Sequence, residues 1–269
     1  MHLVRFMNST GRIGWGRLVE PSKALPLQGD LFGDHEFGER PVDVVKRLAP
    51  VDPPNVFAIG LNYRGHAEEQ GLKSLPERPL IFLKATTSVT GPGAPIMLPA
   101  EAPDEVDFEA ELAVIIGRRC RDVSEAHALE FVLGYTCAND VSARDCQKRL
   151  DKQWARAKSF DTFCPLGPVI ATADSFNPGS ARIQALLNGD AMQDSNISDM
   201  IFSVPQLVSY LSRQFTLLPG TAILTGTPAG VGFTRNPPRH LRDGDSITIE
   251  IEGIGRLTNP VVQETAEWL

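Results

Sequence analysis

Residues 106–117, with the sequence V-D-F-E-A-E-L-A-V-I-I-G, constrain the fold of the 269-residue chain more than any other stretch. Alternate residues of a β-strand share one face, so in an extended conformation Asp107, Glu109 and Glu111 point the same way. The alternation then gives way to residues 112–116, which are apolar on both faces. A run of this kind is typical of a strand that is buried on both sides. The pattern therefore predicts a strand that enters the core where the carboxylates lie.

Two interpretations of these carboxylates remain open from the residues alone. They could form the solvated side of an amphipathic strand. Alternatively, carboxylates that are crowded together in a medium of low dielectric constant either take up protons or bind a cation. A set of ligands that are all oxygen selects a hard cation, Mg²⁺ or Mn²⁺, before zinc.

Three other segments contain candidate site residues, and each also has an ordinary structural interpretation. Asp140 follows the apolar run 134–138 and could be a third oxygen ligand at a strand end, or it could cap a helix or close a turn. His66 and Glu69 share a helical face, where a carboxylate helps an imidazole act as a base, although such pairs also occur on surfaces. Lys158 lies among apolar neighbours and could be a buried electrophile or could extend to solvent.

Composition excludes several classes of partner. The formal net charge of -7 argues against a nucleic-acid partner or an anionic membrane, because both would repel the chain. The N-terminal residues lack the apolar segment of a signal peptide, and the apolar run 112–116 is too short to span a bilayer. The four cysteines have irregular spacings, which favours free thiols over disulfides or a zinc site. We expect a cytoplasmic protein.

The chain is expected to divide near residue 50. Residues 1–50 predict a small N-terminal domain of short strands with one helical segment near 42–48, and the prolines of residues 49–55 predict a linker. Residues 51–269 predict a larger domain of the α+β class that is mostly β. Its expected strands are 56–60, 80–83, 108–116, 134–138, 169–171, 222–224 and 246–251, and its expected helices are 124–133 and 204–213.

The order of the motifs resembles the fumarylacetoacetate hydrolase family. From about residue 56 to 254 the chain reads G-x-N-Y-x-x-H-x-x-E, D-F-E-A-E-L-A-V-I-I-G, G-Y-T-x-x-N-D-V-S-A-R-D-x-Q, W-x-x-x-K-S-F-D-x-F-x-P-L-G-P, N-G-x-x-x-Q and L-x-P-G-x-x-I-L-T-G-T-P-A-G-V-G. The chain looks like the small bacterial branch, since we find no match for the extra aspartate ligand of the larger eukaryotic enzymes. The resemblance implies a mixed β-sandwich roll with a small N-terminal domain, and a homodimer.

The resemblance also assigns roles to individual residues. The metal ligands, for Mg²⁺ or Mn²⁺, would be Glu109, Glu111 and Asp140. The catalytic residues would be His66, Glu69 and Lys158. Gln147 and Thr227 would bind substrate, and Arg144 could bind a second acid group on the substrate, as could Arg64 or Arg235.

These residues could support several related reactions on a 2-keto acid. The first expectation is a metal-dependent hydrolase that cleaves the C–C bond of an acylpyruvate to pyruvate and a carboxylic acid. His66 would activate water, and Lys158 would stabilise the oxyanion. The alternatives are a hydroxyhepta-diene-dioate isomerase, an oxaloacetate decarboxylase, and a catalytically idle ligand-binding relative. The intact candidate set argues against the last. Residues 66–79 are expected to form a lid that substrate orders.

Overall fold

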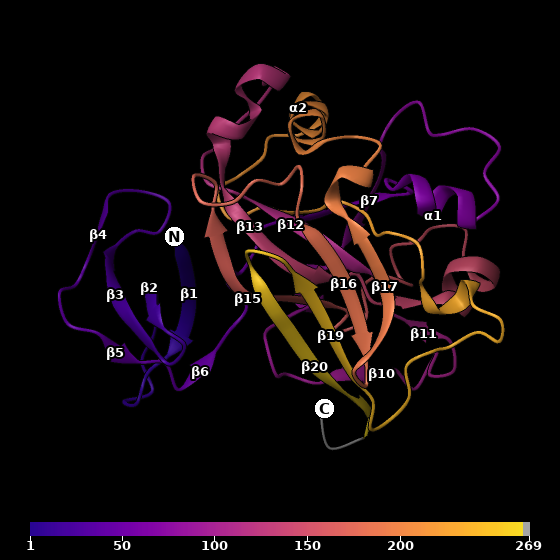
Figure 1. Cartoon of the computed structure of the whole chain (residues 1–269), viewed down its shortest axis with the longest axis horizontal. Helices are drawn as coiled ribbons and strands as arrows, with labels where there is room; N and C mark the ends of the chain where they lie inside the picture. Colours follow the sequence, from indigo (N-terminus) through magenta and orange to yellow (C-terminus); the bar gives the residue numbers. More distant parts are fainter. Residues whose placement is uncertain (266–269) are drawn as a thin grey trace.

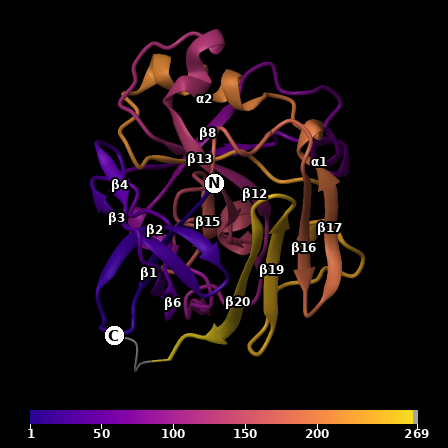
Figure 2. The ribbon, with the colours of Figure 1, turned by 60° about the vertical axis from the view of Figure 1, so that its left-hand side comes forward.

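Two β-sheets that pack face to face form the larger body of the molecule, and the computed structural model describes residues 1–265 (Figure 1). The first sheet has the order β15-β13-β12-β18-β7-β8 in this body, and the second has the order β10-β20-β19-β16-β17. The strands of the first sheet are β7 (Val56–Gly60), β8 (Leu80–Lys84), β12 (Ala110–Ile116), β13 (Val132–Asn139), β15 (Cys164–Thr172) and β18 (Ala222–Leu224). Those of the second are β10 (Ile96–Leu98), β16 (Arg182–Leu187), β17 (Asp190–Asn196), β19 (Ser246–Ile251) and β20 (Gly255–Gln263). Figure 2 shows β20, β19, β16 and β17 side by side.

Strand β12 lies in the middle of the first sheet and is buried along its whole length. Leu112, Val114 and Ile116 belong to the core cluster that includes residues of the second sheet, whereas Ala113 and Ile115 belong to a separate cluster. This division follows from the period of two in a strand. The expected strand that is apolar on both faces is therefore present, and the prediction of a mostly β fold with packed sheets is confirmed.

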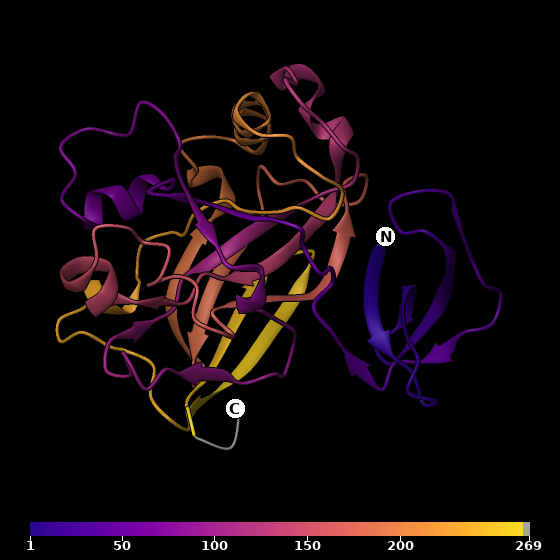
Figure 3. The same cartoon turned by 180° about the vertical axis from the view of Figure 1, so that it is seen from behind.

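The first six strands lie to one side of this body (Figures 1 and 3). They are β1 (His2–Met7), β2 (Ile13–Glu20), β3 (Lys23–Gly29), β4 (His35–Phe37), β5 (Val42–Asp43) and β6 (Lys46–Arg47). Strand β1 pairs with β15, through His2 opposite Ala171 and Leu3 opposite Ile170, so these strands continue the first sheet. The domain boundary near residue 50 stays a prediction.

Helices are few and short. Among residues 1–265 they are α1 (Arg64–Glu69), α2 (Val204–Gln214) and five short 3₁₀ or π segments, namely η1 (Thr86–Ser88), η2 (Glu125–Phe131), η3 (Cys146–Leu150), η4 (Ile197–Asp199) and η5 (Gly232–Thr234). Helix α2 begins where Gln206 Oε1 accepts a hydrogen bond of 2.8 Å from the backbone N–H of Ser203, the reciprocal half of a capping box. Three two-residue strands complete the elements, β9 (Val89–Thr90), β11 (Val106–Asp107) and β14 (Ser142–Ala143). Within residues 1–265, none of the helices has the length and apolar character needed to cross a membrane.

Two helix predictions need correction. Residues 42–48 are not helical: β5 pairs with β3, β6 pairs with β1, and the backbone N–H of Leu48 donates to Arg5. The β-branched valines of this segment favour extended structure, which also satisfies the free edges of β1 and β3. In the segment 124–133 only the turn η2 forms, because residues from Val132 onward already pair in β13.

Candidate active site and metal centre

Three buried carboxylates meet at one end of β12 and β13. Glu111 lies on β12 opposite Ala138, and Asp140 directly follows the end of β13. Glu109 lies just before β12, and its carbonyl accepts a hydrogen bond of 2.9 Å from the N–H of Asp140. One oxygen from each of the three side chains lies within 4.8 Å of the others. The antiparallel pairing of the two strands thus brings together residues that are about thirty positions apart in the sequence.

The charges of this cluster are only partly balanced. Burial and the negative charges of Asp140 and Glu109 raise the pKa of Glu111 well above its usual value. Burial also acts to raise the pKa of Glu109, but the positive charges of Lys158 and Arg144 outweigh it and hold that pKa low. Glu111 thus has the unfavourable position of a carboxylate beside two others. A divalent cation would stabilise the ionised form of Glu111, and three buried carboxylates are a donor set that fits a hard cation.

Two buried lysines hold the cluster in place. Lys158 Nζ donates to Glu109 Oε2 at 2.7 Å and to Asp140 Oδ2 at 2.8 Å, whereas Lys84 Nζ donates to Asp140 Oδ1 at 2.6 Å and to the carbonyl of Lys158. Burial acts to lower the pKa of Lys158, but the charges of Asp140 and Glu109 outweigh it and raise that pKa. Lys158 therefore remains an ammonium group at neutral pH. Lys84 was not predicted, although a lysine that ends the apolar run of β8 was a local signal for it.

The predicted pair His66 and Glu69 forms a dyad on α1. His66 is buried, and its Nδ1 lies 3.1 Å from Glu69 Oε2. Glu69 Oε1 accepts from the backbone N–H of Gly230 at 3.0 Å and from Thr234 Oγ1 at 2.7 Å. Burial acts to raise the pKa of Glu69, but these hydrogen bonds, with His66 first, outweigh it and lower that pKa. A carboxylate held in this way keeps the proton on Nδ1 and leaves the lone pair on Nε2.

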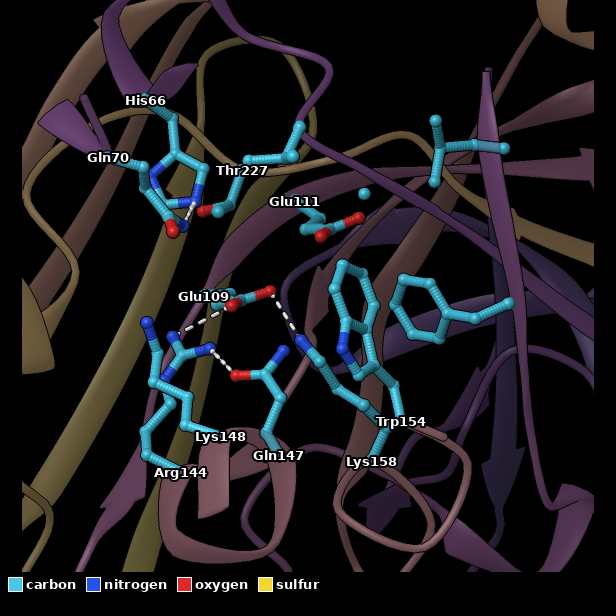
Figure 4. A pocket seen from close by; sticks show the side chains of 14 residues that line it. His66, Gln70, Glu109, Glu111, Arg144, Gln147, Lys148, Trp154, Lys158 and Thr227 are labelled. Atoms are coloured by element: carbon cyan, nitrogen blue, oxygen red, sulfur yellow. Dashed lines mark hydrogen bonds and ion pairs between the residues drawn. The ribbon is translucent and has the colours of Figure 1, made fainter. Parts of the chain in front are cut away.

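A pocket of about 570 Å³, counting the part open to solvent, joins these groups (Figure 4). Of the nine predicted site residues, all except Glu69 and Asp140 line it. Glu69 instead contacts His66, and Asp140 contacts Lys158. His66 Nε2 lies 2.9 Å from the side-chain nitrogen of Gln70, which also lines the pocket. Trp154 and Phe82 pack edge to face on the opposite side. The pocket therefore has a base, an ammonium group and a carboxylate cluster within one small space.

Asp107 is not part of the carboxylate cluster, and the continuous strand on which it was expected to share a face with Glu109 and Glu111 is not present. Its strand β11 pairs with β14 and is separate from β12, so the extended run that we expected is interrupted at residues 108–109. Side chains accept the hydrogen bonds of the backbone N–H groups there: the N–H of Glu109 donates to Asn139 Oδ1, and that of Ala110 donates to Gln193 Oε1. Asp107 Oδ2 instead accepts from Arg144 Nε at 2.9 Å.

The predicted substrate-binding residues are held by neighbours that leave a donor free. Arg144 donates to Gln147 Oε1 at 2.8 Å, and the amide nitrogen of Gln147 has no hydrogen-bond partner among residues 1–265. Gln193 Nε2 donates to Thr227 Oγ1 at 2.7 Å, so the hydroxyl hydrogen of Thr227 is also free. Gln193 is the last residue of the N-G-x-x-x-Q motif, for which the sequence predicted no role.

The two other candidate arginines are not part of the pocket lining. Arg64 donates to the carbonyls of Asp199 and Met200. Arg235 donates to the carbonyls of Gly230 and Met192. Both are therefore engaged in holding backbone segments together.

Comparisons with known proteins agree with this geometry. Residues 55–262 match the family model "Fumarylacetoacetate (FAA) hydrolase C-terminal". The chain is 47% identical over 254 residues to Protein Rv2993c of Mycobacterium tuberculosis, covering 93% of this chain and 92% of that protein. It is 44% identical over 225 residues to the human protein "Oxaloacetate tautomerase FAHD2A, mitochondrial", covering 82% of this chain and 71% of that protein.

Solved structures of proteins with similar sequences also superpose closely on this chain. The 5-carboxymethyl-2-hydroxymuconate delta-isomerase of Mycobacterium smegmatis superposes with a TM-score of 0.87 at 44% identity, over 98% of this chain and 100% of that chain. The 2-hydroxyhepta-2,4-diene-1,7-dioate isomerase of Mycobacterium marinum superposes with a TM-score of 0.85 at 43% identity, over 98% and 99% of the two chains.

Proposed function

Because the chain belongs to the fumarylacetoacetate hydrolase family, we propose that it is a metal-dependent tautomerase or isomerase of small 2-oxo dicarboxylic acids. The observation that carries the proposal is the His66–Glu69 dyad, whose Nε2 lies in the same pocket as Lys158 and the carboxylate cluster. Keto–enol tautomerisation and double-bond isomerisation both require one group that removes a proton from carbon and returns it. The names of similar proteins, oxaloacetate tautomerases and diene-dioate isomerases, support this reaction class.

The proposed metal is one divalent cation, Mg²⁺ or Mn²⁺, held by Glu109, Glu111 and Asp140. The fit rests on three buried carboxylates within reach of one ion and on the raised pKa of Glu111. When bound, the cation supplies Lewis-acid stabilisation of negative charge on the substrate oxygens.

The side chains of the pocket perform the proton transfer. His66 Nε2 takes a proton from C3 of the keto form and returns it to the substrate, while Glu69 keeps the ring oriented. The ammonium group of Lys158, fixed by two carboxylates, stabilises the negative charge that develops on the keto oxygen. Gln147 and Thr227 donate their free hydrogens to the substrate carboxylate. Gln70 lies next to Nε2 and gives way when substrate enters.

A second candidate is the C–C hydrolysis of an acylpyruvate. His66 Nε2 could also deprotonate a water molecule that attacks the C4 carbonyl, with Lys158 near the resulting oxyanion. The products would be pyruvate and a carboxylic acid. The dyad favours this candidate as well, because it can activate water as readily as it can remove a proton from carbon.

The experiment that separates these candidates uses purified protein with Mg²⁺ or Mn²⁺ and two substrates, oxaloacetate and acetylpyruvate. A tautomerase removes the ultraviolet band of enol-oxaloacetate while NMR shows that the keto form stays intact. A decarboxylase also forms pyruvate and CO₂, and a hydrolase forms pyruvate and acetate from acetylpyruvate. The His66→Ala variant is the control. Turnover of neither substrate above the level of this variant would contradict the proposal.

Two accompanying proposals concern assembly and location. We expect a homodimer, which light scattering of the purified protein measures directly. We also expect the cytoplasm, which fractionation of the source cells tests.

A further inference from the structure

The pocket contains three cationic side chains that line it, Arg144, Lys148 and Lys158. Two of them are already paired with carboxylates. Lys158 donates to Glu109 and Asp140. Arg144 contacts Asp107 and Glu109 through Nε and Nη2, and its Nη1 donates to Gln147, so each of its three nitrogens has a protein partner.

Lys148 is different, because it forms neither a hydrogen bond nor an ion pair with any residue of the described range 1–265. It lies on the short helix η3 at the exposed rim of the pocket. Its Nζ lies 3.7 Å from the centre of the Phe233 ring, and the Arg144 guanidinium lies 4.3 Å from the same ring. Partial burial and the charge of Arg144 lower the pKa of Lys148. Two neighbouring cations, only one of which has anionic partners, make this rim a site that attracts an anion.

The position of Lys148 suits the far end of a substrate. In Figure 4, Lys148 and Arg144 lie on one side of Glu109, and Glu111 lies on the other. A substrate whose reacting end lies near His66 and the carboxylate cluster would therefore extend toward Lys148. Phe233 keeps the ammonium group in place, since its backbone N–H is bound by Asp107 at 3.1 Å.

We propose that Lys148 binds the second carboxylate of the substrate and so selects 2-oxo dicarboxylates over 2-oxo monocarboxylates. This inference rests on the proposed function and names the residue that sets its specificity. Arg144, which was expected to have this role, acts instead as a positioning residue for Gln147 and Glu109. Because the rim is exposed, salt screens the interaction.

The test compares two substrates that differ only at the far end, oxaloacetate and 2-oxobutanoate, in which a methyl group replaces the second carboxylate. Exchange of the C3 hydrogens with solvent deuterium, followed by NMR, measures turnover of both. Lys148→Met is expected to raise KM for oxaloacetate about fivefold, the upper range for an exposed ion pair, and to leave kcat and both constants for 2-oxobutanoate unchanged. Lys148→Arg should restore the preference. Lys152→Met, at an exposed lysine outside the pocket, is the matched control.

A binding measurement decides the inference even if the wild-type protein exchanges neither substrate, a result that would refute the proposed function. Malate and 2-hydroxybutanoate form the same matched pair without a keto group, and calorimetry with the Mg²⁺-loaded protein measures their affinities. The wild-type protein should bind malate more tightly, the difference should shrink at high salt, and Lys148→Met should abolish it. Equal affinities in the wild-type protein, or an equal loss for both ligands in Lys148→Met, would overturn the inference.

Discussion

Replacing Asp107 by asparagine should destabilise the whole protein and leave the metal-binding carboxylates able to bind. Asp107 is fully buried, at 0% exposure, and receives hydrogen bonds on both oxygens. Oδ1 accepts from the backbone N–H of Gly232 at 2.8 Å and of Phe108 at 2.9 Å. Oδ2 accepts from Arg144 Nε at 2.9 Å and from the N–H of Phe233 at 3.1 Å. The side chain therefore joins β11, the buried arginine and the turn η5.

The magnitude follows from what the amide cannot do. Asparagine keeps one acceptor oxygen, but its NH₂ group must face donors whichever way it turns. The charge of Arg144 also loses its main partner, and breaking a buried ion pair on one side costs about 3–5 kcal/mol. For a chain of this size, each kcal/mol lowers Tm by roughly 2–4 °C. We therefore expect Tm to fall by roughly 6–20 °C.

Thermal unfolding followed by circular dichroism measures this effect, with Asp34→Asn, an exposed aspartate, as the matched control. Calorimetric titration with Mn²⁺ well below Tm should give an affinity within about threefold of wild type, because Asp107 lies outside the carboxylate cluster. An unchanged Tm would refute the reasoning about burial. A loss of Mn²⁺ affinity as large as that of Glu109→Gln would show that Asp107 is a ligand after all.

Four other predictions concern the site and the thiols. Glu111→Gln should weaken Mn²⁺ binding at least about tenfold, ~1.4 kcal/mol, and calorimetry showing wild-type affinity would contradict the metal centre. His66→Ala should lower turnover ~100-fold with Mn²⁺ affinity retained, so undiminished turnover would mean that another group is the base. Burial raises the pKa of Cys164 to about 12, and all four cysteines are buried. A thiol reagent at pH 8 should therefore label the protein only after unfolding, and rapid labelling of the native state would contradict this prediction. If residues 66–79 form a lid, oxalate should slow their hydrogen exchange, whereas equal exchange with and without oxalate would mean that the dyad is pre-assembled.

Segments with a regular hydrophobic pattern were the most predictable elements: β7 and β18 are short apolar runs, β19 alternates polar and apolar residues, and α2 is amphipathic. Strands β7, β18 and β19 have the residues expected from the sequence, and α2 is one residue longer than expected. In each of these elements the hydrophobic pattern and the boundary residues indicate the same structure. The local sequence is sufficient to predict these elements because the burial pattern and the intrinsic propensities of the residues favour the same structure.

Strands with an irregular hydrophobic pattern were not predictable. β16 and β17 alternate polar and apolar residues only in part, and β20 contains Asn259 and Pro260. Their structure depends on pairing: β16 and β20 pair with β19, and β17 pairs with β16, over separations of a few to more than sixty residues. The helix prediction for residues 42–48 was wrong for the same reason, because pairing with the edges of β1 and β3 determines the conformation of this segment.

In the site, the motif spacing identified the carboxylates but not the groups that balance their charge. Glu109 and Glu111 were expected on one face of a continuous strand, yet the backbone is interrupted before Ala110 and the interruption depends on Asn139 and Gln193. Lys84 reaches Asp140 from β8, at the far edge of the sheet order. A lysine at the end of an apolar strand indicates only that its ammonium group needs a partner, and the fold determines that this partner is Asp140.

The glycine-rich segment 225–234 shows how one motif can serve a role different from the one its composition suggests. Glycine-rich loops that bind phosphate direct backbone N–H groups at an anion. Here the same kind of N–H groups are directed at the protein's own carboxylates: they bind Glu111 at 2.7 Å, Glu69 at 3.0 Å and Asp107 at 2.8 Å.

Glycine is required in this segment for a steric reason. Gly226 has φ of +96°, and a Cβ there would lie 2.8 Å from Asn62 Cβ, while a Cβ at Gly232 would overlap with the carbonyl oxygen of Arg239. The carboxylates come from three separate parts of the chain, namely α1, β11 and β12. One short segment therefore binds a carboxylate of the dyad, a carboxylate of the buried Asp107–Arg144 ion pair and a carboxylate of the metal-binding cluster.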